Sequence, residues 1–184
     1  GAKQLLFFLT GGGAAGGGAA AAGEGSGGGS ASTTIALITV SGGEATTIVI
    51  GAGSVAVAAA NAANGGDSTF TYVSGGTSFS TVTAKGGIGG VYYTSAQSLP
   101  VAGTVGATNT GIAFYGGMGT PPIHGSTLGA SSFYGSGGAG AVNGKQVAFV
   151  GLAAGSGGGG AISTSGYRTS GAGADGCIII YVFK

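Results

Sequence analysis

The chain has 184 residues, of which 47 are glycine and 5% are charged, and its formal net charge is +1. With 43% hydrophobic residues it is not a solvated disordered coil, which requires few apolar residues and a high net charge. Scattered charges exclude a basic face for nucleic acid, a single cysteine excludes an internal disulfide, and no apolar run is long enough to span a membrane.

The two ends of the chain carry the densest apolar clusters. Residues 4–9 (QLLFFL) and 177–183 (CIIIYVF) have the β-branched and aromatic composition of strands. The second run predicts a strand that is buried on both faces. We expect these two strands to frame the fold. We also expect a processed product or the ordered end of a longer protein, because the chain begins with glycine and not methionine.

A glycine tract at residues 11–30 follows the first strand, and a similar tract occupies residues 155–173. Gly11, Gly13 and Gly16 formally match a dinucleotide-binding fingerprint, which requires a helix next and an acidic residue about 20 positions later. Further glycines oppose that helix by about 1 kcal/mol each, and Glu24 comes too soon. We therefore predict no nucleotide site. Both tracts are expected to pack as polyglycine-like extended helices side by side.

Short strands are predicted between the tracts. Residues 33–50 contain two β-branched runs on either side of a short glycine turn, which is the pattern of a β-hairpin. Residues 77–83 (TSFSTVT) alternate with the period of two that is typical of a strand, and residues 147–152 (VAFVGL) indicate another. The fold class predicted is all-β, in one domain over residues 1–184.

An aromatic loop region at about residues 91–134 differs from the rest of the chain, because it contains all three prolines and the only histidine. Loops on a rigid scaffold often carry recognition residues, and tyrosine among Ser, Gly and Asn is typical of binding loops. A second reading stays open, in which these aromatic rings fill the gaps that Gly and Ala leave in the core. The candidate contact residues are Tyr92, Tyr93, Tyr115, His124 and Tyr134.

Catalysis is not predicted. His124 has no second histidine, neighbouring carboxylate or nucleophile motif with which to form a triad or a metal site. We expect no catalytic residue, no cofactor and no metal.

The order of motifs resembles the glycine-rich C-terminal domain of bacteriophage tail fibre proteins. An apolar strand leads into a triple-glycine run (residues 5–18), and a later strand ends in TIVIGAG (residues 47–53). GGTSF (residues 75–79) and VTAKGG (residues 82–87) follow in order. The chain closes with GADG and an Ile/Val/Tyr strand (residues 173–183).

The resemblance implies an extracellular virion protein at the distal fibre, which contacts other virion proteins and binds a host receptor, either a polysaccharide or an outer-membrane protein. It also implies a homotrimer. Self-assembly is expected independently, because small side chains and few charges leave one chain short of buried area. Two alternatives stay open, another phage structural or decoration fibre and an extracellular glycine-rich filament.

Overall fold

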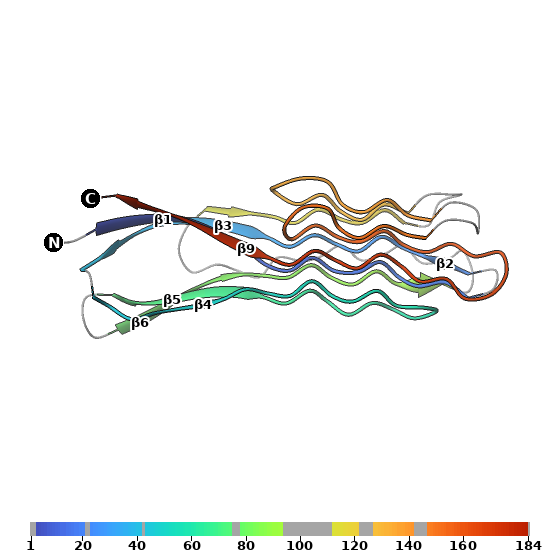
Figure 1. The fold of residues 1–184 in the computed structure, drawn as a ribbon, viewed down its shortest axis with the longest axis horizontal. Helices are drawn as coiled ribbons and strands as arrows, with labels where there is room; N and C mark the ends of the chain where they lie inside the picture. The colour runs from blue at the N-terminus through green and yellow to red at the C-terminus, as the bar shows by residue number, and fades with distance from the viewer. Residues whose placement is uncertain are drawn as a thin grey trace.

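The computed structural model describes residues 3–20, 23–41, 43–74, 78–93, 112–121, 127–141 and 147–183. In this part of the chain all regular structure is strand, which confirms the all-β prediction. The strands of the two larger sheets gather at one end with both termini, and glycine-rich extended segments run from them to the far end, where β2 (Glu24–Gly25) lies (Figure 1). The strands are β1 (Lys3–Thr10), β2 (Glu24–Gly25), β3 (Thr33–Val40), β4 (Thr46–Val49), β5 (Ser68–Ser74), β6 (Ser78–Ala84), β7 (Tyr92–Tyr93), β8 (Ile112–Phe114) and β9 (Cys177–Phe183).

The largest sheet has four antiparallel strands in the order β8-β3-β1-β9. Strand β1 lies inside it and pairs with both neighbours, so that Phe7 is opposite Ala36 on one side and Ile180 on the other. The two predicted terminal strands are therefore both present and pair with each other in the largest sheet, as expected for strands that frame the fold. The prediction that the last strand is buried on both faces is wrong, because β9 lies at the sheet edge and most of its side chains are exposed.

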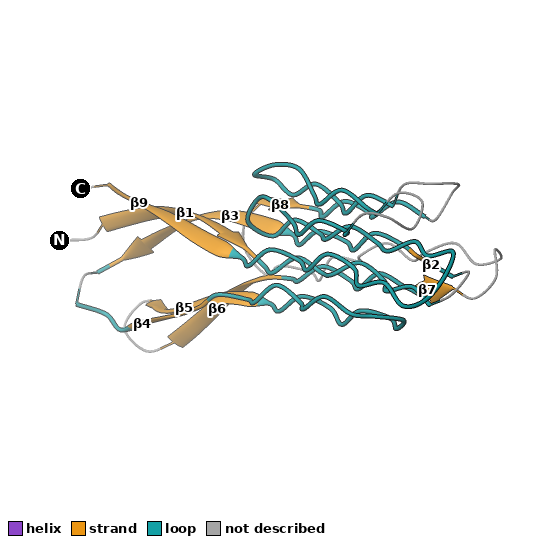
Figure 2. Cartoon of the chain, turned by 45° about the vertical axis from the view of Figure 1, so that its right-hand side comes forward, coloured by secondary structure: helices purple, strands orange, loops and turns teal. Residues whose placement is uncertain are grey.

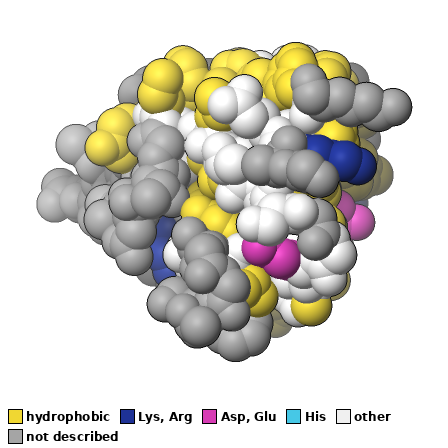
Figure 3. All heavy atoms as spheres, turned by 90° about the vertical axis from the view of Figure 1, so that its left-hand side faces the viewer, with side chains coloured by type: hydrophobic (Ala, Val, Ile, Leu, Met, Phe, Trp, Pro, Cys, Tyr) yellow, Lys and Arg dark blue, Asp and Glu magenta, His cyan; other side chains and the backbone are white. Residues whose placement is uncertain are grey.

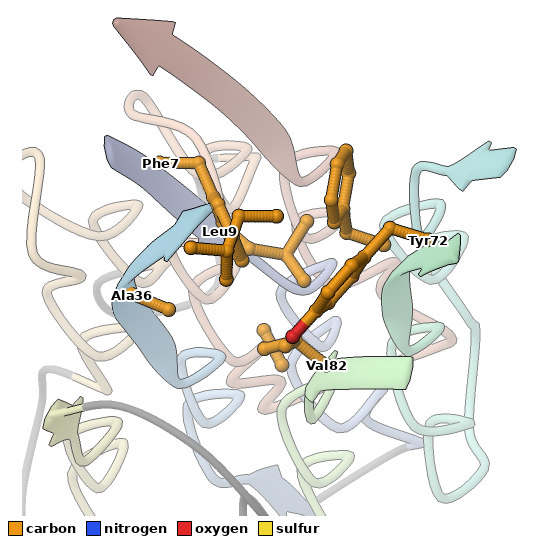
Figure 4. Close-up of a cluster of buried hydrophobic side chains, with 8 residues drawn as sticks. Phe7, Leu9, Ala36, Tyr72 and Val82 are labelled. Carbon is orange, nitrogen blue, oxygen red and sulfur yellow. The ribbon is translucent and has the colours of Figure 1, made fainter. Parts of the chain in front are cut away.

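A second sheet, β4-β5-β6, packs against one face of the first and encloses the hydrophobic core (Figure 4). The rings of Phe7 and Phe70 meet across the interface, with their centroids 4.8 Å apart. The predicted strand at residues 77–83 is confirmed as β6, shifted by one residue. The core comprises Phe7, Leu9, Ala36, Ile38, Phe70, Tyr72, Val82 and Ala84.

The hairpin predicted at residues 33–50 is wrong. Both runs are strands, but β3 pairs with β1 and β8, whereas β4 pairs with β5 in the other sheet. The local pattern is the same whether two runs pair with each other or separate across the core. The partner of β3 is decided by β1, which pairs with it over eight residues. The four-residue turn between the two runs carries no information about this long-range pairing.

The glycine-rich segments have a three-residue repeat. Along residues 11–19, positions 11, 14 and 17 donate backbone N–H groups to residues 26–32, whereas positions 13, 16 and 19 donate to residues 168–174. Positions 12 and 18 donate to a third side, at residues 60–66. Three residues per turn with no internal hydrogen bonds is the geometry of the polyproline II helix. The prediction of polyglycine-like helices packed side by side is confirmed.

Three of these segments, residues 11–19, 25–32 and 155–163, form the centre of the glycine bundle and are buried throughout. The other segments surround them and expose side chains on their outer sides. Residues 147–152, predicted as a strand, form one of these outer segments. Phe149 shows why the strand prediction is wrong, because its N–H and C=O bond to different neighbours, Ala139 and Gly159, and not to one adjacent strand.

Close packing in the centre depends on glycine. A Cβ atom added to Gly28 would lie 2.5 Å from the carbonyl oxygen of Ala15 and 2.7 Å from the carbonyl carbon of Ala14. No alanine fits there unless the backbones separate. The bundle interior is therefore held by paired peptide groups, and among the described residues most large side chains lie at the sheet end or the surface, with Ile162 a buried exception at the far end.

Candidate functional site

Tyr92 and Tyr93 lie together at the far end of the glycine bundle. They form β7, which pairs with β2 so that Tyr93 is opposite Glu24 (Figure 2). The Tyr92 N–H donates to Oδ1 of Asn61 at 2.7 Å, which fixes the backbone of this short strand. Both side chains are half-buried, and burial raises the pKa of Tyr93 above its usual value. The backbone of both tyrosines is held in place, and their side chains still reach solvent.

Tyr115 occupies a different place, directly after β8 and close to the strands. Its side chain is 77% exposed, and Met118, one three-residue turn later, is 61% exposed. Both point outward because every third residue of an outer segment faces solvent. Tyr115 is therefore available for contact, but along the side of the molecule and not at the far end.

Tyr134 lies in a turn, between Ser132 and Gly135, that packs beside the sheet. Its hydroxyl is buried near Thr10 and Cys177 and forms no hydrogen bond of regular geometry. Burial, together with the neighbouring Cys177 thiol, raises the pKa of Tyr134 to about 12. The hydroxyl is shielded from an external ligand, so this ring serves packing, as the core-filling alternative expects.

The five sequence candidates therefore do not form one site. The consecutive Tyr92 and Tyr93 lie at the far end, Tyr115 and Tyr134 lie near the sheet, and His124 lies outside the described residues.

Sequence reasoning missed Tyr167, which is 75% exposed at the far end. It follows a turn in which the Ser163 hydroxyl donates to the carbonyls of Ser165 and Gly166. Just before that turn, Ile162 bridges to Glu24, which also pairs with Tyr93. The available signal was an aromatic residue interrupting a glycine-serine tract. We define the far-end surface as Glu24, Tyr92, Tyr93 and Tyr167.

A family model described as a glycine-rich domain matches residues 1–183. The chain belongs to this glycine-rich domain family. No curated protein matches the chain. Within the part of this glycine-rich domain that the structure describes, no three His, Cys, Asp or Glu side chains lie close enough to hold a metal ion. Across the same residues there is no long apolar helix capable of crossing a membrane.

Proposed function

We propose that this glycine-rich domain is the distal domain of a bacteriophage tail fibre and attaches the virion to a receptor on the host cell surface. It acts by binding and not by catalysis, outside the cell, as a homotrimer joined to other virion proteins. The order of sequence motifs supports the phage context. The observation that carries a binding role is the far-end surface, where tyrosines are half-buried or exposed on a rigid scaffold, opposite both chain termini (Figure 1).

The chemistry of the far-end surface suits a sugar ring or an apolar protein side chain. A tyrosine offers an aromatic face and one hydroxyl, and it loses little rotamer entropy when a ligand binds. The backbone of Tyr92 and Tyr93 is positioned before binding by the β7–β2 pairing and the bond to Asn61. Because only 5% of the residues are charged, we expect binding to vary little with salt. Tyr115 and His124 remain secondary candidates, and Tyr134 contributes packing.

Binding of the labelled, purified domain to a panel of bacterial cells tests this proposal. We expect the double variant Tyr92→Ser, Tyr167→Ser to bind the responsive strain at least 10-fold more weakly, as expected when contact aromatics are truncated. Phe149→Ser is the matched control, because this ring is also exposed but lies along the side of the bundle. Tyr134→Ala should lower thermal stability while the folded protein still binds.

Two outcomes would overturn the proposal. One is a folded parent protein that binds no cell in the panel. The other is a folded Tyr92→Ser, Tyr167→Ser variant that binds as tightly as the parent.

A further inference from the structure

The outer face of the four-stranded sheet, which points away from the core, carries apolar side chains on all four strands, with the polar Gln4 and Thr39 at its margin beside Phe183. Residues paired directly across antiparallel strands share a face. Ile112, Ile35, Phe8 and Ile179 form one such row. The next row contains Leu37, Leu6 and Tyr181.

Turn residue Phe133 extends this face, with its ring centroid 5.1 Å from that of Phe114 and 6.3 Å from that of Phe8. None of the described residues on this face is charged. Figure 3 shows hydrophobic side chains gathered along the upper side of this end, which is the side of the four-stranded sheet. We define the outer sheet face by its large exposed side chains, Leu37, Ile112, Phe114, Phe133, Ile179, Tyr181 and Phe183.

The second sheet provides an internal comparison, because its outer face carries five threonines beside Val49 and Val73. Thr71 and Thr81 lie opposite each other there, with their hydroxyl oxygens 3.0 Å apart in a hydrogen bond. Both outer faces belong to antiparallel sheets of one molecule, but the face of the second sheet is the more polar of the two. The threonines are Thr47, Thr69, Thr71, Thr81 and Thr83.

The exposed area is that of a protein interface. The seven side chains of the outer sheet face are 39–66% exposed. At about 200 Å² for a whole large side chain, they present about 700 Å² of apolar surface. A stable interface takes about 800 Å² from each partner, so this face is large enough to form most of one.

The face continues to an open edge. Among the described strands, β9 pairs only with β1, and Cys177–Phe183 contains neither a charged residue nor a proline that would block further pairing. An exposed, apolar edge strand of seven residues is a template for association unless another chain covers it.

We propose that the outer sheet face, together with the β9 edge, is the interface through which copies of this chain assemble. A face without charge offers a foreign partner little electrostatic complementarity, whereas a second identical face presents the same large apolar side chains. Interfaces between permanently associated identical subunits are more apolar than the interfaces of transient complexes. The inference names the surface used by the proposed homotrimer, and it does not depend on host attachment.

Light scattering on the size-fractionated protein tests the interface. We expect the parent to have a fixed mass that is a small multiple of 16.8 kDa, with a trimer as the expected form. Leu37→Lys, Tyr181→Lys should give a folded monomer, because it places two charges on the outer sheet face. The matched control Thr71→Lys, Thr81→Lys places the same charges on the threonine face and should keep the parent mass.

A monomeric parent, a polymer without a fixed mass, or a Leu37→Lys, Tyr181→Lys protein of unchanged mass would overturn the inference. If that variant fails to fold, hydrogen exchange in the parent decides. The amides of β9 must exchange more slowly in concentrated than in dilute protein, and equal rates would contradict the interface. These changes leave the far-end surface intact, so loss of assembly is distinguishable from loss of host binding.

Discussion

Replacement of Gly28 by alanine measures how strongly the glycine bundle depends on backbone contact. Gly28 lies in the central segment 25–32 and faces the central segment 11–19. The nearest atom to the added Cβ is the Ala14 oxygen, and the next, the Ala15 oxygen, would lie at 2.5 Å, whereas an ordinary contact is about 3.4 Å. The two segments must therefore move apart by at least about 0.9 Å. Neither can do so freely, because each has further segments on its other sides.

The cost follows from that displacement. Overpacking of a close-packed interior costs about 1–3 kcal/mol. The hydrogen bond from Ala14 N–H to the Gly29 carbonyl, now 3.0 Å, would be lost at about 1 kcal/mol. Reduced flexibility of the unfolded chain returns about 0.4–1 kcal/mol. We expect a net loss of about 1–3.5 kcal/mol, which lowers the Tm of a domain of this size by about 2–14 °C.

Thermal and urea unfolding, followed by circular dichroism, measure this loss. Gly117→Ala is the matched control, because the nearest atom to its added Cβ is the Ser131 oxygen at 3.3 Å and the next is the Ala130 Cβ at 3.5 Å. It should change stability by less than about 1 kcal/mol. Equal stability of the folded Gly28→Ala and Gly117→Ala proteins would refute the reasoning, because close backbone approach would then carry no cost.

The remaining predictions concern buried polar groups. Ser54→Ala leaves the buried Ala15 N–H without its 2.6 Å partner, the Ser54 Oγ, and should cost about 1–3 kcal/mol in urea unfolding, whereas Thr71→Val at the exposed face should cost less than half as much. Tyr134 has a folded pKa of about 12 against an ordinary value of 10.0, so its hydroxyl ionises first in the unfolded state. Its contribution to the free energy of unfolding is therefore complete below pH 10 and is lost as the pH rises to 12. The urea midpoint of the parent should therefore fall more between pH 8 and 11 than that of Tyr134→Phe, and parallel falls would show that Tyr134 is not responsible.

The sequence predicts features of this fold that depend on local composition. The runs at residues 4–9 and 177–183 are strands, and the glycine tracts form extended helices because no other structure brings backbones so close. The separation of β3 and β4 into different sheets could not be predicted, since it depends on the pairing of β3 with β1, which is distant in the chain. The prediction of a strand at residues 147–152 is wrong for a related reason. Strand composition does not reveal that this segment bonds to different neighbours on different sides.

Prediction of the candidate site depends even more than prediction of the fold on knowing which distant segments of the chain lie at the same end of the molecule. Tyr92 and Tyr134 share a loop-like sequence context, but one lies beside β2 at the far end and the other beside Thr10 near the sheet. The bundle separates them because successive segments reverse direction over its whole length. Tyr167 joins the far end from a segment about 75 positions later than Tyr92, a relation that no local pattern encodes.

The burial of peptide groups in place of hydrocarbon at the centre has a thermodynamic consequence. Exposure of apolar surface raises the heat capacity on unfolding, and exposure of polar surface lowers it. Residues 11–19, 25–32 and 155–163 are fully buried yet consist mainly of Gly, Ala and Ser. Unfolding them exposes an unusually polar surface, so the heat-capacity change per residue should fall below the usual value of about 12–15 cal/mol/K. The curve of free energy against temperature is then flatter, and the domain keeps a similar stability over a wide range of growth temperatures.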